Sequence, residues 1–561
     1  MPERTLIQVI LPLRLEWEPC YWAPDNVREG DRVAVVFARK QYVAVVHRIG
    51  VEAGFDLSKV QPVLDVDTGL PPVSPRELAL WEFIASYYLC SIGEVYYAAY
   101  PHNKIKSEKV AAKAAQAAER RHALEMDSLT ARLERMKARL GAKEETILRR
   151  KSSGRASAEV TARLEEERDT LLSQVVTLKD HISRIAGSLE EAQGVPELPE
   201  VASGGPRPAL LQSSSRTQSY LDAIAGALSL GRQVLVLAPD VLYCHSLSAA
   251  LSAGSSGLLE FTSKETPVHR RRISDAVRNG TASVVVGTRS ALFLPFMDLG
   301  LIIVDEEQDT FYKQDEPAPR YGCRDCAVKL ARIHGAEIIL GSACPSLETL
   351  LNAKSGRYEV LPGSGPVPIA AEVVDMSAER RKRGVYGLFS FKLVEAVRRC
   401  EGPVVLIRGW ERTEDLQQQI AELFPERDVR VMRWLEAREA DLSEAAVVGI
   451  LQADALVDKD DFRADERGTQ IVAQLSSRCR HLVVQTNVTS RFDGSRTVQD
   501  LLDERRDFGF PPYTRVVDLR RRGTGEVIQR FFLKKDSSLA ARKAGILASA
   551  PKDSFIDVDP L

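Results

Sequence analysis

The sequence predicts an α/β protein with parallel sheets. Four apolar runs between residues 233 and 343 alternate with helical stretches, which is the pattern of parallel strands joined by helices. They are Gln233–Asp240, Ala282–Thr288, Leu299–Glu307 and Ala336–Ala343. A second, shorter series of the same kind comprises Pro403–Ile407, Val429–Met432, Ala446–Asp454 and His481–Thr486. Two such series predict two α/β lobes in succession.

The most informative strand end is that of the third run. Its apolar residues stop abruptly at Asp305, Glu306, Glu307 and Gln308. A buried parallel strand presents such carboxylates at the carboxyl edge of its sheet, where nucleotides bind. There the first carboxylate can hold Mg²⁺ and the second can polarise a water. A strand end with solvated carboxylates is the alternative interpretation.

Composition places the chain among ordinary globular proteins. It has 561 residues, a net charge of -2, 44% hydrophobic and 27% charged residues, so any nucleic-acid-binding surface must be local. No apolar run reaches the length of a membrane span, and the first residues match a signal peptide poorly. The eight cysteines are mostly scattered, which is typical of reduced thiols. These features predict a cytoplasmic protein that does not contact a membrane.

The flanking regions differ from the α/β series. Residues 1 to 101 contain short strand-like runs at Leu6–Leu11, Val33–Phe37 and Tyr42–Val46, followed by an apolar helix at Leu78–Tyr88. From Lys104 to Gln193 there is no proline, and apolar residues recur at spacings of three and four on both sides of a break at residues 151–157. Two heptad helices joined by a turn predict an antiparallel coiled-coil hairpin. It is interpreted as a spacer, with a basic DNA-binding or partner-binding arm as the alternative.

Several segments, in order along the chain, resemble one family. They are Gly287–Phe296, Val304–Gln314, Pro317–Val328, Gly341–Tyr358, Asp461–Gln470, Phe508–Arg515 and Asp557–Pro560. In this pattern the chain resembles the primosomal protein N′ (PriA) family of replication-restart DNA helicases, which belong to superfamily 2. The resemblance implies two RecA-like helicase lobes, with a small β-rich N-terminal domain and the coiled-coil hairpin inserted before them.

The same resemblance predicts the domain boundaries. The expected units are a 3′ DNA-end-binding domain at 1–102, the coiled-coil insertion at 103–194, the first lobe at 195–366, the second lobe at 367–495 and a reduced C-terminal domain at 496–561. The coiled coil takes the place of the family's winged helix. No cysteine ladder follows Gly402–Arg412, where the family carries a zinc module, and the lone pair Cys323 and Cys326 is interpreted as two ordinary thiols. The sequence therefore predicts no zinc.

The phosphate loop departs from the family. Its nucleotide-binding positions fall on Ser215, Arg216 and Thr217, where the family has Gly-Lys-Thr. Amides that close around phosphates need glycine, and arginine is longer and forked, so it does not simply replace the lysine. Residual catalytic positions are Asp305, Glu306, Gln308 and, in the second lobe, Arg478. The departures predict that Mg-ATP, the family's cofactor, is no longer hydrolysed productively.

The resemblance also suggests where DNA would bind. The N-terminal positions are Tyr21, Arg39 and Lys40, although the family's neighbouring residues are altered. The first lobe adds Arg289 and an aromatic-rich loop whose rings and cations suit stacking on bases and contact with phosphates: Phe311, Tyr312, Lys313, Arg320, Tyr321 and Arg324. A packed loop core with buried Phe311 is the alternative interpretation.

Three functional hypotheses follow. The first is a DNA-binding protein of replication restart that recognises forked or 3′-ended DNA and recruits other primosome proteins, with ATPase and helicase activity lost. The second is an active ATP-dependent 3′→5′ DNA helicase. The third is a primosome assembly scaffold that acts through its coiled coil. Binding of Mg-ATP separates the second from the others, and salt-dependent fork binding separates the first from the third.

Overall fold

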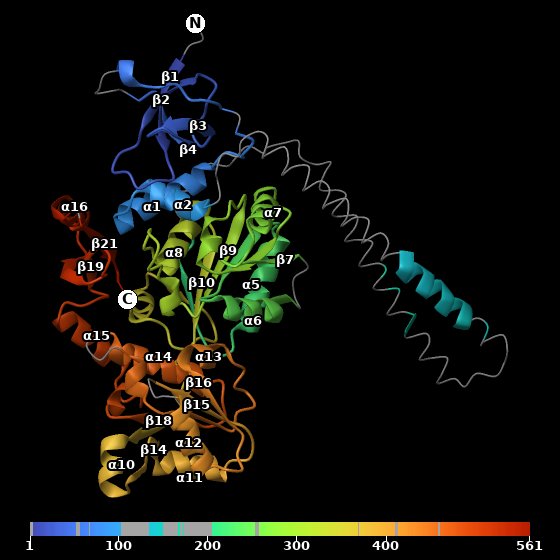
Figure 1. Ribbon diagram of the computed structural model, residues 1–561, viewed down its shortest axis with the longest axis vertical. Helices are drawn as coiled ribbons and strands as arrows, with labels where there is room; N and C mark the ends of the chain where they lie inside the picture. Colours follow the sequence, from blue (N-terminus) through green and yellow to red (C-terminus); the bar gives the residue numbers. More distant parts are fainter. Residues whose placement is uncertain are drawn as a thin grey trace. The chain divides into compact units, whose positions relative to one another are not determined.

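The structure is a computed structural model of the chain (Figure 1). It describes residues 4–51, 57–66, 68–101, 134–147, 149, 167, 168, 172, 175, 205–252, 257–368, 370–409, 413–457, 461–551 and 553–560. The chain divides into two compact units, of which one comprises residues 1–103 with 200–561 and the other residues 104–199. Within the described part of the chain, every helix is too short or too polar to cross a membrane.

The N-terminal region forms a four-stranded antiparallel sheet in the order β2-β1-β4-β3. Its strands are β1 (Arg4–Ile10), β2 (Cys20–Pro24), β3 (Arg32–Phe37) and β4 (Lys40–Ile49), and η1 (Leu57–Lys59) follows. Two helices come next, α1 (Pro75–Tyr88) and α2 (Ile92–Ala99), and each begins with a serine capping box. Trp81 of α1 is fully buried and stacks on Tyr96 of α2 at 5.5 Å, which fixes the helices against one another.

The first lobe contains a seven-stranded sheet whose pairings are all parallel, in the order β11-β5-β10-β9-β6-β8-β7. The strands are β5 (Ala209–Gln212), β6 (Gln233–Leu237), β7 (Leu258–Phe261), β8 (Val284–Gly287), β9 (Leu299–Asp305), β10 (Glu337–Ser342) and β11 (Glu359–Val360). The connecting helices are α5 (Thr217–Ser229), α6 (Val241–Ser252), α7 (Pro267–Arg278), η2 (Arg289–Phe293), η3 (Thr310–Tyr312), α8 (Cys323–His334) and α9 (Leu347–Lys354).

Strand β9 shows how this lobe is held together. All seven of its residues are buried. Ile302 and Val304 face a core shared with α7 and α8, whereas Leu301 and Ile303 face a core shared with α5 and α6. Side chains alternate between the faces of a strand, so a strand covered by helices on both faces is apolar throughout. Burial ends at the carboxyl edge, where the acidic residues follow.

The second lobe repeats this architecture with a five-stranded parallel sheet in the order β12-β18-β17-β15-β16. Its strands are β12 (Glu372–Asp375), β15 (Val404–Arg408), β16 (Val429–Arg433), β17 (Val447–Ile450) and β18 (Leu482–Thr486), with a hairpin of β13 (Val385–Tyr386) and β14 (Phe389–Ser390). The helices are α10 (Met376–Lys382), α11 (Phe391–Arg399), α12 (Thr413–Leu423), α13 (Trp434–Glu439), η4 (Ala453–Leu456), α14 (Ala464–Ser476) and η5 (Thr489–Arg491).

The C-terminal part adds α15 (Val498–Asp507) and a three-stranded antiparallel sheet in the order β20-β19-β21. Its strands are β19 (Thr514–Arg521), β20 (Val527–Lys534) and β21 (Ser554–Val558), and α16 (Leu539–Ser549) connects the last two. Val517 and Val558 pack in the core that also holds α1 and α8. This part is therefore joined to the first lobe through a shared apolar core.

In the second unit, residues 134–147 are helical. Ile147 is buried and Met136, Leu140 and Lys143 are partly buried, which follows a 4-3-4 spacing along one face of the helix. Lys143 forms an ion pair with Glu167, so the segments before and after the break lie side by side at this point. Most of the predicted coiled coil lies outside the described residues, and the coiled coil stays a prediction.

The predicted fold class is confirmed. The eight strands expected in the two α/β series are present as β6, β8, β9, β10, β15, β16, β17 and β18. The short strands β5, β7, β11 and β12 were not among those expectations, because two to four residues carry too little periodic pattern.

Candidate nucleotide site and nucleic-acid interface

The altered phosphate loop lies between β5 and α5 and turns its arginine inward. Ser213 and Ser215 form a local turn in which the Ser215 amide donates to the Ser213 hydroxyl at 3.2 Å. Arg216 follows as the N-terminal cap residue of α5, and its side chain is buried. Ser215 and Thr217 are exposed on either side of it. The loop thus presents a buried guanidinium where the family's loop holds phosphates.

The guanidinium of Arg216 binds the first two residues of the acidic strand end, Asp305 and Glu306. Its Nε donates to Asp305 Oδ1 at 2.7 Å, and its Nη2 forms a hydrogen-bonded ion pair with Glu306 Oε1. A further bond runs from Nη1 to the Ser213 carbonyl at 2.6 Å. The side chains of Arg216, Asp305 and Glu306 are almost fully buried, so the two ion pairs are shielded from water.

Two tyrosines complete this arrangement. Tyr220, one helical turn after Arg216, donates to Asp305 Oδ1 at 2.7 Å, and Tyr243 of α6 donates to Asp305 Oδ2 at 2.9 Å. The Tyr220 hydroxyl fits because residue 341 is glycine, since a Cβ there would lie 1.7 Å from it. Both Asp305 oxygens are therefore already accepting hydrogen bonds from the protein.

The electrostatics match this geometry. Burial lowers the pKa of Arg216, but Asp305 and Glu306 raise it, and the resulting pKa is well above the ordinary arginine value. Burial and then Asp305 raise the pKa values of Tyr220 and Tyr243 well above that of a free phenol. Arg216 therefore stays charged and both tyrosines stay protonated, as donors to a carboxylate, across the physiological range.

The remaining acidic-motif residues are also engaged. Gln308 donates to Glu306 Oε2 at 2.7 Å, and Glu306 itself has a positive φ of 49°. Glu307 accepts from the Ser346 amide at 2.6 Å and from Arg324 at 3.0 Å. The acidic strand end is thus connected to the start of α9 and to α8 through buried hydrogen bonds.

The residues present do not fit Mg-ATP. A metal would have to displace Arg216 and two phenols from Asp305 and Glu306, and a triphosphate would meet a loop without the glycines that let amides close around it. Among the described residues, no group of three or more histidine, cysteine or acidic side chains is arranged to hold a metal ion.

Arg478 is placed near this site but binds backbone. It donates from Nη1 to the Arg438 carbonyl at 2.7 Å and from Nη2 to the Ala440 carbonyl. Arg438 in turn crosses to the first lobe, where it lies 3.0 Å from Asp240 and 2.7 Å from Asp309. Its guanidinium also lies 4.8 Å from the centre of the Phe311 ring. Arg438, whose carbonyl is bound by Arg478, thus joins the two lobes beside the acidic strand end.

Most predicted DNA-binding residues of the aromatic-rich loop make contacts within the protein. Tyr312 is buried and donates to the carbonyls of Leu237 and Asp305. Lys313 donates to Val558 at 2.6 Å, and its amine lies 2.8 Å from a carboxylate oxygen of Asp557. The other three residues also contact the protein. Tyr321 is buried against Phe293, Arg320 stacks on Phe555 and Arg324 pairs with Glu307.

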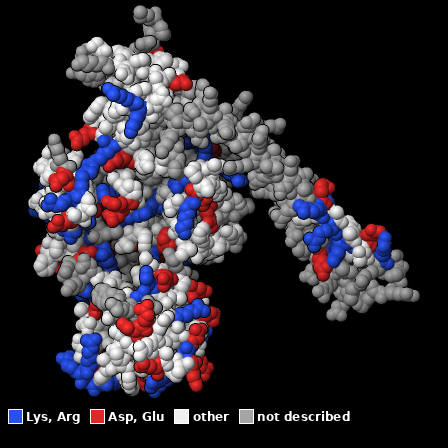
Figure 2. Space-filling view, viewed as in Figure 1, with Lys and Arg blue, Asp and Glu red and all other residues white. Residues whose placement is uncertain are grey.

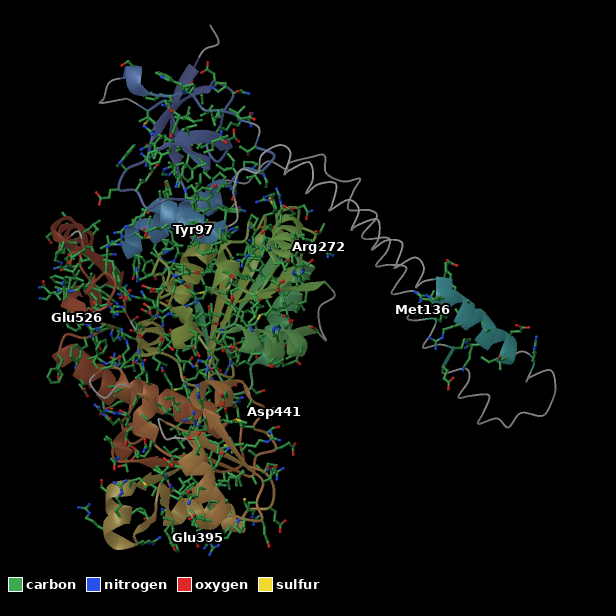
Figure 3. All side chains as sticks on the ribbon, viewed as in Figure 1. Tyr97, Met136, Arg272, Glu395, Asp441 and Glu526 are labelled. Carbon is green, nitrogen blue, oxygen red and sulfur yellow. The ribbon has the colours of Figure 1, made fainter. Side chains whose placement is uncertain are left out.

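Three predicted residues, Arg289, Phe311 and Tyr321, line a cavity of about 370 Å³ at the carboxyl edge of the first sheet. The Phe311 ring is 36% exposed. Arg270 of α7 also lines this cavity, and the next two residues, Arg271 and Arg272, are exposed on the same helix. Arg272 is labelled in Figure 3. Two cations and a partly exposed ring at one cavity form a surface suited to a nucleic-acid strand.

The three DNA-binding residues predicted in the N-terminal sheet, Tyr21, Arg39 and Lys40, differ in exposure. Tyr21 is buried and donates to the Val36 carbonyl at 2.9 Å. Arg39 and Lys40 are exposed at the turn between β3 and β4, where both Ala38 and Arg39 have positive φ, 48° and 65°. Glycine is favoured in such a turn, so Ala38 holds a strained backbone there. The two cations remain accessible to phosphates.

Sequence reasoning missed Tyr220, Tyr243, Arg270 and Arg438. Tyr220 had a detectable signal, because residues four apart on a helix share a face and Arg216 precedes it by four. Tyr243, Arg270 and Arg438 had none, since their contacts depend on how separate elements pack. The roles assigned to the predicted site residues stay predictions.

Comparison with solved structures gives weak overall matches. RecG bound to a three-way DNA junction matches with a TM-score of 0.36 and 16% identity, covering 65% of this chain and 52% of RecG. A DEAD-box protein from Methanococcus jannaschii matches with a TM-score of 0.29 and 13% identity, covering 54% and 87%.

The two parallel α/β lobes, with an acidic strand end in the first, define an α/β protein with two RecA-like lobes. A family model described as the 3′ DNA-binding domain matches residues 8–101. The chain is 38% identical over 191 residues to the replication restart protein PriA of Chlamydia muridarum, covering 33% of this chain and 25% of the relative. Over these matched segments the chain is similar to proteins of the PriA family.

Another relative, PriA of Haemophilus influenzae, is 28% identical over 380 residues, which cover 64% of this chain and 51% of the relative. PriA of Bacillus subtilis is 24% identical over 420 residues, covering 54% and 51%. The chain thus spans between a quarter and about half of the length of the curated relatives it matches.

Proposed function

We propose that this chain is a DNA-binding protein of replication restart that recognises forked or 3′-ended DNA and does not hydrolyse ATP. The observation that carries the proposal is the guanidinium of Arg216, which is buried on Asp305 and Glu306. A helicase needs these carboxylates for Mg²⁺ and its phosphate loop for the triphosphate. In this chain the loop's own cation neutralises them.

Removing Arg216 from this position would be energetically unfavourable. Breaking a buried ion pair by taking away one partner costs about 3–5 kcal/mol, because a charge is left buried and unpaired. Mg²⁺ loses water ligands reluctantly and needs near-ideal octahedral geometry. The two phenols bound to Asp305 add to what must be displaced. The site therefore favours its internal arginine over a metal-bound nucleotide.

Two surfaces support the DNA-binding part of the proposal. The cavity at the first sheet offers Arg270, Arg289 and Phe311, and the N-terminal sheet offers Arg39 and Lys40. The match of residues 8–101 to a 3′ DNA-binding domain and the relatives' name, replication restart protein, point to the same class of ligand. Other primosome proteins are the partners that this role requires, and the second unit is the candidate surface for them.

The test is fork binding by fluorescence anisotropy together with ATP turnover, on one preparation of the full chain. We expect fork binding that weakens steeply with salt, and no turnover with or without the fork. Arg216→Lys is measured beside the wild type, with Ser215→Ala as the control in the same loop. Fork-stimulated turnover by the wild type would establish the active-helicase hypothesis instead. Absence of fork binding would favour the assembly-scaffold hypothesis.

A further inference from the structure

The end of α10 in the second lobe carries four consecutive cations. Arg380, Arg381 and Lys382 form its last turn, and Arg383 follows as the cap residue; all four are exposed. We call these four residues the α10 patch. Figure 2 shows lysine and arginine side chains gathered at this end of the lobe, in a chain whose net charge is only -2.

The cations of the α10 patch have no carboxylate partner in the part of the chain that the structure describes. Among the described residues, no aspartate or glutamate lies within ion-pair distance of any of its four side chains, whereas neighbouring Lys392 pairs with Glu372 at 2.9 Å. Cations are stabilised at a helix C-terminus by about 0.3–1 kcal/mol each, but the effect fades beyond the last turn. The helix dipole therefore stabilises the cations of the last turn of α10 and does not account for the fourth cation, Arg383.

Helix α10, which carries the patch, is anchored to the second lobe through its N-terminal cap and its buried face. Asp375 caps α10 by accepting from the Ser377 and Ala378 amides, both at 2.9 Å. Met376 and Glu379 are buried, and Glu379 accepts from the Lys392 amide at 3.3 Å. Because the helix is anchored through its buried face, its cations are presented on a rigid element, which lowers the entropy lost when they bind a ligand.

Two partly exposed rings flank the cations. Tyr386 is 45% exposed and Phe391 is 38% exposed. The guanidinium of Arg383 lies 5.7 Å from the centre of the Phe391 ring, which leaves its N–H groups free to donate at the edge. The hairpin between the rings is held by Gln419, which accepts from the Leu388 amide at 3.0 Å.

We propose that the α10 patch binds the sugar-phosphate backbone of duplex DNA. The inference rests on the proposed function and deepens it, because the cavity at Arg289 lies on the other lobe and the patch supplies a second, separate contact for a double-stranded arm. Four adjacent, rigidly mounted and unpaired cations match the regular phosphate charge of a duplex. Contacts of this kind hold and orient the DNA and do not read its sequence.

A membrane surface is the other polyanion to consider, and the structure favours it less. A helix that lies in a membrane interface exposes an apolar face. The apolar residue of α10, Met376, is buried in the lobe instead. Helix α10 therefore presents charge on a rigid surface without an apolar face of its own, and Arg383 lies over the neighbouring Phe391 ring.

The test compares two double variants that remove the same charge from the same lobe. Arg381→Gln with Lys382→Gln alters the patch, and Arg430→Gln with Arg433→Gln alters exposed cations of strand β16 as the matched control. Binding of the full chain to a fork, to a blunt duplex and to a single strand is measured by anisotropy over a range of salt. Arg381→Lys, which keeps the charge, is measured alongside.

We expect the patch variant to lose affinity for the fork and the duplex, and its salt slope to shrink by about 1 for each phosphate contact removed. The control variant, Arg381→Lys and single-strand binding should be unchanged. The inference would be overturned if the patch and control variants bound DNA equally well, or if the wild type did not bind the duplex. In either case, fork binding by the wild type would still support the proposed function. The chain is also tested on vesicles of phosphatidylserine in phosphatidylcholine. If only the patch variant lost vesicle binding while its duplex binding stayed intact, the patch would be assigned to a membrane.

Discussion

At the scale of single residues, the chemistry of this chain depends on one substitution and its neighbours. Arg216 stands where the family has lysine, and its longer, forked side chain reaches Asp305 and Glu306 together. Tyr220 and Tyr243 bind the aspartate as well. The two carboxylates are therefore part of a buried network with an internal cation.

Replacing Arg216 by alanine should destabilise the protein strongly. Two buried carboxylates would lose their cation, and we expect the free energy of unfolding to fall by about 3–5 kcal/mol. Urea unfolding followed by circular dichroism measures this change. Ser215→Ala, at an exposed position of the same loop, should change stability little. A loss below about 1 kcal/mol, typical of exposed pairs, would contradict the buried network.

His47 provides a prediction that depends on pH. Burial lowers the pKa of its imidazole, but Glu18 and Glu82, at 2.6 and 2.9 Å, raise it, and the resulting pKa is above the ordinary value. A raised folded-state pKa means that this contribution to stability is complete below about pH 6.5, the unfolded value, and is lost as pH rises through the folded-state pKa. The difference in thermal midpoint between wild type and His47→Gln should therefore be larger at pH 6 than at pH 9. A constant difference would contradict the paired imidazolium.

At the scale of elements, a short helix of the second lobe joins the lobes. Arg438 of α13 reaches Asp240 after β6 and Asp309 before η3, and Arg478 holds the carbonyl of Arg438. In an active motor this closure would be driven by nucleotide contacts in both lobes. In this chain, side-chain ion pairs of Arg438 join the two lobes.

Arg438→Met should loosen this junction. The Asp309 side chain is buried and would be left without its cation, so we expect the free energy of local opening to fall by about 3 kcal/mol. Hydrogen exchange of the amides in η3 and α13 measures the effect, and those of β15 serve as an internal control. Unchanged exchange in η3 and α13 would show that the lobes are held elsewhere.

At the scale of the whole molecule, stability should not respond to nucleotide. A ligand that binds only the folded state at 100 times its Kd adds about 2.7 kcal/mol to stability. We expect Mg-ATP to leave the thermal midpoint unchanged, because Arg216 occupies its carboxylates. A forked DNA should raise that midpoint, as the positive control on the same sample. A rise with Mg-ATP alone would show that the nucleotide displaces Arg216.

Much of this protein was predictable from the sequence. The apolar runs predicted the parallel strands because a strand buried on both faces has to be apolar throughout, as β9 is. The acidic residues at its end and the altered loop at Ser215–Thr217 were visible without a structure. So was the resemblance to the PriA family, since it is carried by short motifs in order along the chain.

Only the tertiary structure decided what those residues do. Arg216 and Asp305 are 89 positions apart, and they meet because β5 and β9 both flank β10 in the sheet. A loop pattern does not show whether a flexible arginine points to solvent or to a carboxylate, because that choice depends on the burial around it. The same holds for Tyr312 and Lys313, whose types suggested DNA contact and whose hydrogen bonds the fold uses internally. Local sequence determines which elements form, whereas partners distant in the chain determine whether a side chain is free to act.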